Sequence, residues 1–154
     1  MKKVLSFVIN SETYCIDVMS VVSIDQKSQI NQIPLTPAHV LGVINLRGQI
    51  IPVIDLRKLF QIPMDSLVHR ESCTICIDTD QGRLGCVVDS VSDVVELIDN
   101  QYESVATDSM NAQSVKYIEQ ILKIKDKINF LLNTKVIYES MSDFGTISQL
   151  EKAG

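Results

Sequence analysis

Short apolar runs that are rich in β-branched residues recur along this chain and favour a β-rich fold. They are separated by links of turn-forming residues, and they cover residues 4–9, 14–18, 43–46, 50–54, 73–77, 84–88, 91–98, 118–124 and 128–137. Runs of this length and composition are typical of β-strands, and polar links such as 10–13, 79–82 and 125–127 are typical of hairpin turns. The pattern predicts an all-β fold of one or two small barrels, because closure leaves no unpaired strand edge.

Two of these runs flank a tight polar turn at Arg47 and Gly48. Residues 43–46 and 50–54 are apolar and β-branched, so they are expected to fold back on each other as a hairpin. Gly48 allows the positive φ that such a turn needs, while the Arg47 side chain is directed into water. The sequence therefore predicts that Arg47 is displayed on the surface.

Helix signals are few. Thr36 and Pro37 offer an N-cap and a first helical residue for a turn over 36–40, and residues 55–60 are expected to form another turn. Residues 17–22 fit either a turn of helix or a strand, and 99–115 has the polar composition of a surface loop. We expect one domain over residues 1–140, followed by a C-terminal tail or short helix over 141–154.

Composition excludes several classes of function. The chain has 154 residues, a net charge of −5 and no Trp, which argues against a nucleic-acid-binding surface. The apolar run at 4–9 is too short and too interrupted for a signal peptide, and no stretch is long enough to insert directly into a membrane. We expect a soluble, cytoplasmic protein.

The residues give little support for catalysis, a metal ion or any other cofactor. The two histidines, His39 and His69, are expected at solvent-exposed positions, and no motif for a nucleophile or for phosphate binding is present. His69, Cys73 and Cys76 have zinc-like spacing, but a strand through Cys73 and Cys76 would direct them to opposite faces. The four cysteines are expected to be reduced, buried thiols: Cys15, Cys73, Cys76 and Cys86.

Residues 40–57 (VLGVINLRGQIIPVIDLR) closely resemble the signature of the CheW family of bacterial chemotaxis adaptors. The resemblance extends over nearly the whole chain, in matching order, through residues 14–18 (YCIDV), 33–37 (IPLTP), 85–94 (GCVVDSVSDV) and 125–132 (KDKINFLL). It implies two interlocked, five-stranded, SH3-like β-barrels with short helical turns and a small C-terminal helix.

The resemblance also implies a function and a set of binding residues. Members of the family are non-enzymatic adaptors that couple the cytoplasmic tip of methyl-accepting chemoreceptors to the regulatory domain of the chemotaxis histidine kinase. Such a protein is cytoplasmic and is recruited to the inner face of the membrane through the receptors. Carried onto this chain, the receptor-binding positions are Val21, Ile24, Gly42, Asn45 and Arg47, and the kinase-binding positions are Ile30, Ile33 and Pro34.

Several positions differ from the family pattern. Cys15 replaces a usual Gly, Gln61 replaces a Gly, and Ser23 stands where an acidic residue is common. Ser23 removes a charge from the receptor-facing region, which leaves open an accessory scaffold in another kinase pathway, such as surface motility, that does not bind ordinary receptors. A small-molecule-binding β-barrel is a further alternative, and it would require a deep pocket with convergent polar groups.

Overall fold

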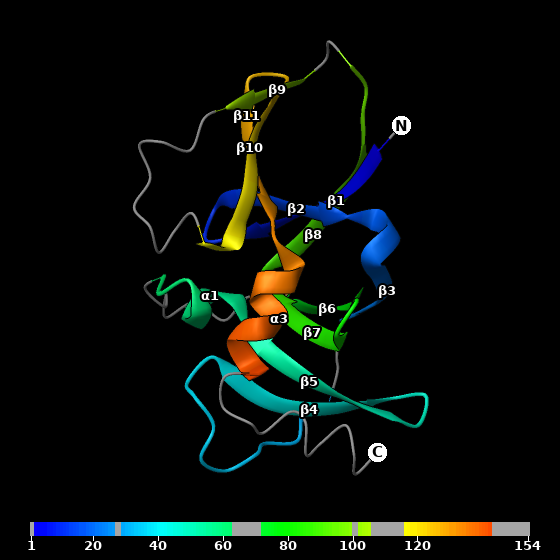
Figure 1. The fold of residues 1–154 in the computed structure, drawn as a ribbon, viewed down its shortest axis with the longest axis vertical. Helices are drawn as coiled ribbons and strands as arrows, with labels where there is room; N and C mark the ends of the chain where they lie inside the picture. The colour runs from blue at the N-terminus through cyan, green and yellow to red at the C-terminus, as the bar shows by residue number, and fades with distance from the viewer. Residues whose placement is uncertain (1, 27–28, 63–71, 100–101, 106–115, 143–154) are drawn as a thin grey trace.

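The computed structural model describes residues 2–26, 29–62, 72–99, 102–105 and 116–142, and within them the chain forms two antiparallel-rich sheets (Figure 1). The six-stranded sheet has the order β8-β1-β2-β11-β10-β9. Its strands are β1 (Lys2–Ile9), β2 (Glu12–Asp17), β8 (Ser90–Leu97), β9 (Tyr102–Val105), β10 (Ile118–Ile124) and β11 (Lys127–Leu132). The five-stranded sheet has the order β3-β6-β7-β5-β4. Its strands are β3 (Val21–Asp25), β4 (Val40–Leu46), β5 (Gln49–Asp55), β6 (Cys73–Thr79) and β7 (Gly82–Val88).

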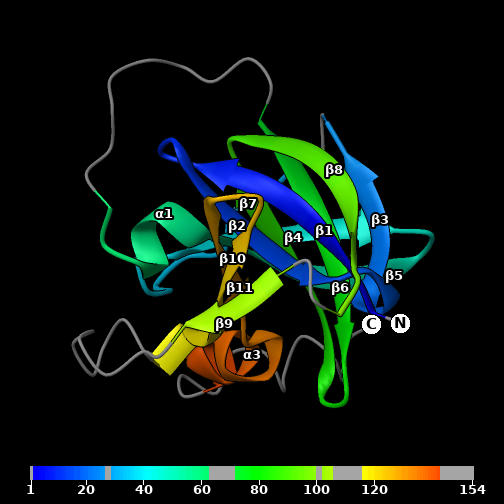
Figure 2. The same ribbon diagram turned by 90° about the horizontal axis from the view of Figure 1, so that it is seen from above.

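The two sheets are interlocked in the sequence. All strands of the five-stranded sheet lie between β2 and β8, so the chain leaves the six-stranded sheet and later returns to it. On its return, β8 pairs with β1 and β11 pairs in parallel with β2 (Figure 2). This confirms the predicted all-β, two-barrel class, with the difference that one sheet has six strands instead of five.

The predicted hairpins are confirmed, because each depends on local sequence. The turns at Asn10 and Ser11 and at Lys125 and Asp126 place both residues at positive φ, between 51° and 69°. Two-residue turns of this kind match the twist of antiparallel strands. They join β1 to β2 and β10 to β11.

The main hydrophobic core lies between the two sheets. It contains Phe7 and Tyr14 from the six-stranded sheet, and Ile54 and Ile77 from the five-stranded sheet. A short helix, α3 (Thr134–Ser142), closes this core and contacts β6 and β7 (Figure 1). Ile137, Tyr138 and Met141 of α3 are each at most 4% exposed. One shared core therefore fixes the two sheets relative to each other.

A buried ion pair adds a polar connection between the sheets. Arg57 lies in α1 (Leu56–Leu59), directly after β5, and Asp89 lies between β7 and β8. The Arg57 guanidinium donates to both oxygens of Asp89, at 2.9 Å from Nε and 2.6 Å from the second nitrogen, and Asn10 N donates to the same carboxylate at 2.7 Å. Asp89 thus joins α1 to the β1–β2 turn.

The structure corrects three local predictions. Residues 36–40 contain a single hydrogen-bonded turn, in which Val40 N donates to the Pro37 carbonyl at 3.0 Å, but no helix, and the Thr36 hydroxyl donates to the Ile33 and Val40 carbonyls instead of acting as an N-cap. The predicted strand 128–137 ends at Leu132, and α3 begins after Asn133, whose Oδ1 accepts from Val136 N. Residues 102–105 of the predicted loop 99–115 form the strand β9, and its residues 100–101 and 106–115 lie outside the described part of the chain.

Two other local predictions have clear outcomes. The turn over 55–60 is confirmed as α1, with Asp55 as its N-cap. Residues 17–22 combine both alternatives, since a 3-10 turn, η1 (Val18–Ser20), precedes β3.

His69 and most of the predicted tail lie outside the described residues. Within the described part of the chain, no helix has the length and apolar character required to cross a membrane.

Candidate functional site

The β4–β5 turn exposes the Arg47 side chain to solvent. Arg47 has φ 53° and Gly48 has φ 83°, which defines a tight two-residue turn between the paired residues Leu46 and Gln49. Asn45 Oδ1 accepts a hydrogen bond from Gly48 N at 2.9 Å. Arg47, Gly48 and Asn45 are all exposed, as predicted for Arg47. No carboxylate within the described ranges forms an ion pair with Arg47, so its guanidinium is available to a partner.

Gly42 has a structural role beneath this surface. It is buried at φ 150°, and a Cβ atom there would lie 2.1 Å from the carbonyl oxygen of Asn31. The absence of a side chain lets Asn31 exchange two backbone hydrogen bonds with Val43, at 2.8 and 2.9 Å. Gly42 therefore positions the segment around Asn31 against β4.

The predicted residues of β3 lie at the opposite edge of the five-stranded sheet, but the sheet curls so that its edges meet. Ser23 of β3 and Asn45 of β4 line one pocket of about 180 Å³. Ile24 is 46% exposed but is not among the lining residues, and Val21 is half-buried and packs against the main core. The structure thus brings Asn45 together with Ser23 and Asp25 of β3, and not with the two predicted residues of that strand.

The pocket between β3 and β4 has mostly polar lining residues, and Asp25 is the charged residue among them. Its lining residues are Ser23, Asp25, Gln29, Asn31, Ile44, Asn45, Leu46 and Cys76. Burial raises the pKa of the Cys76 thiol, so this group stays neutral at physiological pH. The Ser23 hydroxyl is shielded from solvent and lies beside the Cys76 thiol, where it partly offsets the rise in the pKa of that thiol.

The three predicted kinase-binding residues differ in exposure. Ile30 is half-buried and packs against a small cluster that includes Ile44 and Ile51, and Ile33 is also half-buried. Pro34 is exposed. Leu35 follows it at φ 61° with its side chain fully in solvent. Leu35 was not among the predicted binding residues, although an apolar residue between Pro34 and the polar Thr36 is a usable signal.

Other exposed apolar side chains were also missed. Met19 in η1 is 88% exposed, Val22 in β3 is 36% exposed, and Val94 in β8 is 55% exposed. Met19 and Val22 lie in the ambiguous stretch 17–22, where neither interpretation predicted which side chains face solvent. Single exposed apolar residues are common, but large ones next to each other often mark contact surfaces.

The histidine and cysteine predictions have mixed outcomes. His39 is not an ordinary solvent-exposed residue: its ring interacts with the backbone of Ser140, its Nε2 is shielded from solvent, and burial lowers the pKa of the ring. The expectation failed because α3 covers this position, which local sequence cannot reveal. All four cysteines are buried free thiols, as predicted.

Comparison with known proteins identifies the family. A sequence model of the CheW-like domain matches residues 3–141. The chain is 30% identical to the chemotaxis protein CheW of Bacillus subtilis over 141 residues, which cover 92% of this chain and 89% of the relative. It is 36% identical to the chemotaxis protein CheW of Thermotoga maritima over 101 residues, which cover 66% of each protein.

A solved structure agrees with these relatives. The crystal structure of the scaffolding protein TtCheW from Thermoanaerobacter tengcongensis superposes with a TM-score of 0.76 at 32% identity, and the match covers 86% of this chain and 88% of that one. The match to the CheW-like domain model, over residues 3–141, includes strands of both sheets and the Arg47 turn. This chain therefore belongs to the family of CheW-like domains.

Proposed function

We propose that this protein is a non-enzymatic adaptor that couples chemoreceptors to a chemotaxis histidine kinase. The observation that carries the proposal is the CheW-like domain over residues 3–141, in which the Arg47 side chain projects from a fixed turn without an ionic partner among the described residues. Relatives named as chemotaxis proteins and a relative named as a scaffolding protein support the same role. The protein then acts by binding and bringing partners together.

The receptor is proposed to bind over the β4–β5 turn and the adjacent edge of β3. A guanidinium can hold a carboxylate through two parallel hydrogen bonds, so Arg47 suits acidic side chains or helix carbonyls on a receptor tip. Asn45 contributes by fixing the turn, and Ile24 offers an exposed apolar contact on β3. Val21 and Gly42 support this surface from below, because both are at least half-buried.

The kinase is proposed to bind at Ile30, Ile33 and Pro34, through its regulatory domain. Pro34 is exposed and the two isoleucines are partly accessible. Leu35 extends this apolar surface, since its side chain has no protein contact that shields it from solvent. Apolar contacts of this kind form the centre of many protein interfaces.

The test is a pull-down from cell lysate with the tagged protein, in which bound proteins are identified by mass spectrometry. The wild type is expected to retain both a histidine kinase and chemoreceptors. Arg47→Glu is expected to lose only the receptors and to keep its thermal stability, because exposed substitutions usually change stability by less than about 0.5 kcal/mol. Lys58→Glu, a charge reversal at an exposed position of α1, is the matched control and should behave like the wild type.

A second candidate function follows from Ser23. The CheW family commonly has an acidic residue there, and in this chain the pocket instead holds a neutral hydroxyl. An accessory scaffold in another kinase pathway would retain a kinase without receptors in the pull-down. Retention of neither partner by the wild type would contradict both functions.

A further inference from the structure

The β4–β5 hairpin carries the Arg47 turn beyond the rest of the five-stranded sheet, and Figure 1 shows it projecting at the lower right of the view. β5 pairs with β7 over residues 53–55, whereas β4 and β5 pair with each other as far as Leu46 and Gln49. We call residues 45–50 the hairpin tip. A two-stranded ribbon is only marginally stable by itself, so the orientation of Arg47 depends on what holds this tip.

One side of the hairpin tip is held by apolar packing. Leu46 packs against the small cluster that includes Ile44 and the fully buried Ile51. The side chains of Asn45, Arg47 and Gln49 are exposed. Because exposed side chains gain little from apolar burial, polar contacts are needed to fix this side of the tip.

Arg83 of β7 supplies such a contact from outside the hairpin. Its Nη1 donates a hydrogen bond to Gln49 Oε1 at 3.1 Å, and Gln49 is the residue that follows the turn. Asp78, which lies directly opposite Arg83 in the β6–β7 ladder, has its Oδ1 at 3.8 Å from Arg83 Nε. The planar guanidinium can serve both neighbours at once. Asp78, Arg83 and Gln49 therefore form a polar row that joins β6 and β7 to the hairpin tip.

We propose that Arg83 is a positioning residue for receptor binding, because it holds Gln49, and through Gln49 the Arg47 turn, in the orientation that the receptor recognises. This inference rests on the proposed function. A binding group that is already held in its bound orientation loses less conformational freedom on association, which raises the affinity. Arg83 acts through Gln49 and makes no contact with the receptor.

The contacts favour this role over direct binding of the receptor by Arg83. Its guanidinium already has an amide acceptor and a nearby carboxylate of its own chain, and its side chain is only 37% exposed. The Arg47 side chain, in contrast, forms no ion pair with a described residue. Arg83 would have to give up its present contacts to bind a carboxylate of a partner, which costs affinity.

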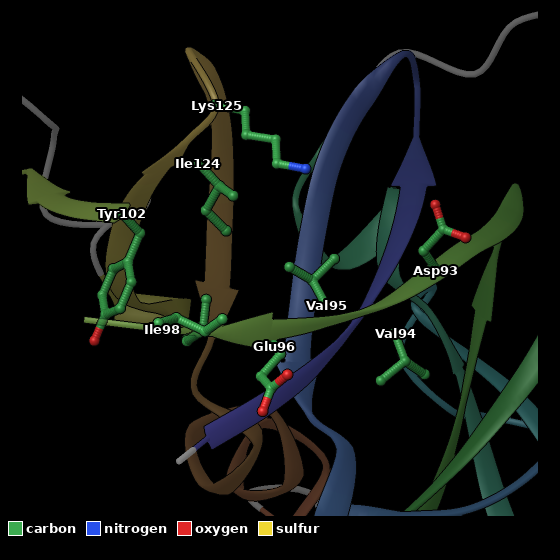
Figure 3. A pocket seen from close by; sticks show the side chains of 9 residues that line it. Asp93, Val94, Val95, Glu96, Ile98, Tyr102, Ile124 and Lys125 are labelled. Atoms are coloured by element: carbon green, nitrogen blue, oxygen red, sulfur yellow. The ribbon is translucent and has the colours of Figure 1, made fainter. Parts of the chain in front are cut away.

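The first test measures the order of the turn in the full-length protein without a receptor, by NMR relaxation of the Arg47 and Gly48 backbone amides. Arg83→Met keeps a long aliphatic side chain without a hydrogen-bond donor, so it should lower the order parameters of both amides. Arg83→Lys should restore them, because its ammonium group can donate to Gln49. Lys125→Met is the matched control and should change neither amide. Figure 3 shows the Lys125 side chain extending from the β10–β11 turn of the six-stranded sheet.

The second test compares the same variants in the pull-down, with the chemoreceptors quantified by mass spectrometry at a series of bait concentrations. Arg83→Met should weaken receptor capture by about three- to tenfold, the scale of one hydrogen bond, and leave the midpoint of thermal unfolding unchanged. Arg83→Lys should recover most of this loss. Gln49→Ala should weaken capture as much as Arg83→Met, and the double variant no further, because both changes break the same hydrogen bond.

The inference is overturned if Arg83→Met leaves the order of the Arg47 turn unchanged, or lowers it without weakening receptor capture. It is also overturned if Arg83→Lys restores the order of the turn but not capture, which would make the guanidinium a direct receptor contact. The proposed function is decided separately, by whether the wild type retains chemoreceptors and Arg47→Glu loses them. These results distinguish failure of the positioning role from failure of receptor binding as a whole.

Discussion

At the scale of single residues, two glycines of the β4–β5 hairpin have different roles. Gly48 lies in the turn at φ 83° with no atom near the position of a Cβ. Gly42 lies beneath the backbone of Asn31, where a Cβ would contact the carbonyl oxygen. Gly48 is required only because the turn needs a positive φ, whereas Gly42 also leaves space for the backbone of Asn31. The effect of adding a methyl group should therefore differ between them.

Gly42→Ala is expected to destabilise the protein by about 3 kcal/mol, the sum of backbone strain at positive φ and the loss of two backbone hydrogen bonds to Asn31. Gly48→Ala is the matched control, and it should cost only about 1 kcal/mol because strain is its sole penalty. Urea unfolding followed by circular dichroism measures both. Equal losses in the two variants would contradict the tight contact at Gly42.

At the scale of secondary-structure elements, the Arg57–Asp89 pair joins parts of the chain that are far apart in sequence. Both residues are buried, with exposures of 5% and 9%, and Asp89 also accepts from Asn10 N. The pair therefore ties α1 to the β1–β2 turn and to the link between β7 and β8. Removal of either side chain should destabilise the protein, because the charge of the other stays buried.

Asp89→Ala is expected to lower the free energy of unfolding by about 3–5 kcal/mol, since Arg57 is left buried without its main partner. The double variant Asp89→Ala/Arg57→Met should recover part of this loss, because it removes the uncompensated charge. Chemical denaturation of the single and double variants measures the difference. A single variant as stable as the wild type would show that the pair contributes little to folding.

The elements also show which features were predictable from sequence. The hairpins at Asn10, Arg47 and Lys125 were predicted because turn residues and flanking apolar runs are local signals. The end of β11 was missed because apolar residues resume at Val136 and Ile137 after a short polar interruption, in which Asn133 marks the start of α3. β9 was missed because its four residues, YESV, alternate little and depend on pairing with β10.

In the candidate site, too, local features were predictable from sequence, whereas contacts between distant segments were not. Exposure of Arg47 followed from the turn, and the resemblance to the CheW family supplied the other positions. Neither could show that Gly42 is covered by Asn31, that His39 lies beneath α3, or that β3 and β4 line one pocket. Each of these contacts joins segments that meet only after the sheets have formed.

At the scale of the whole molecule, the four buried thiols predict how stability depends on pH. Burial raises the pKa of each of them, that of Cys15 to about 12. An unfolded thiol loses its proton above roughly pH 8.5, whereas the folded chain retains it. The free energy of unfolding should therefore be unaffected by the thiols below this pH and fall as the pH rises beyond it.

This pH dependence is measured by urea unfolding under reducing conditions at a series of pH values between about 7 and about 10.5, which spans the thiol pKa of an unfolded chain. Cys15→Ala is the control variant, and its stability should fall less steeply over the same range. Iodoacetamide should modify the native protein much more slowly than the unfolded protein. Rapid modification of the native protein would contradict the burial of the thiols.

The interlocked order of the strands has a consequence for biosynthesis. A ribosome delivers β1 and β2 first, but their neighbours β8 and β11 emerge only after all of β3–β7. The five-stranded sheet can therefore assemble early, while the β1–β2 hairpin waits with both outer edges unpaired and with Phe7 and Tyr14 lacking part of their final packing. The segment synthesised first is thus the last to be completed, and the nascent chain is most exposed to aggregation at its N-terminal hairpin.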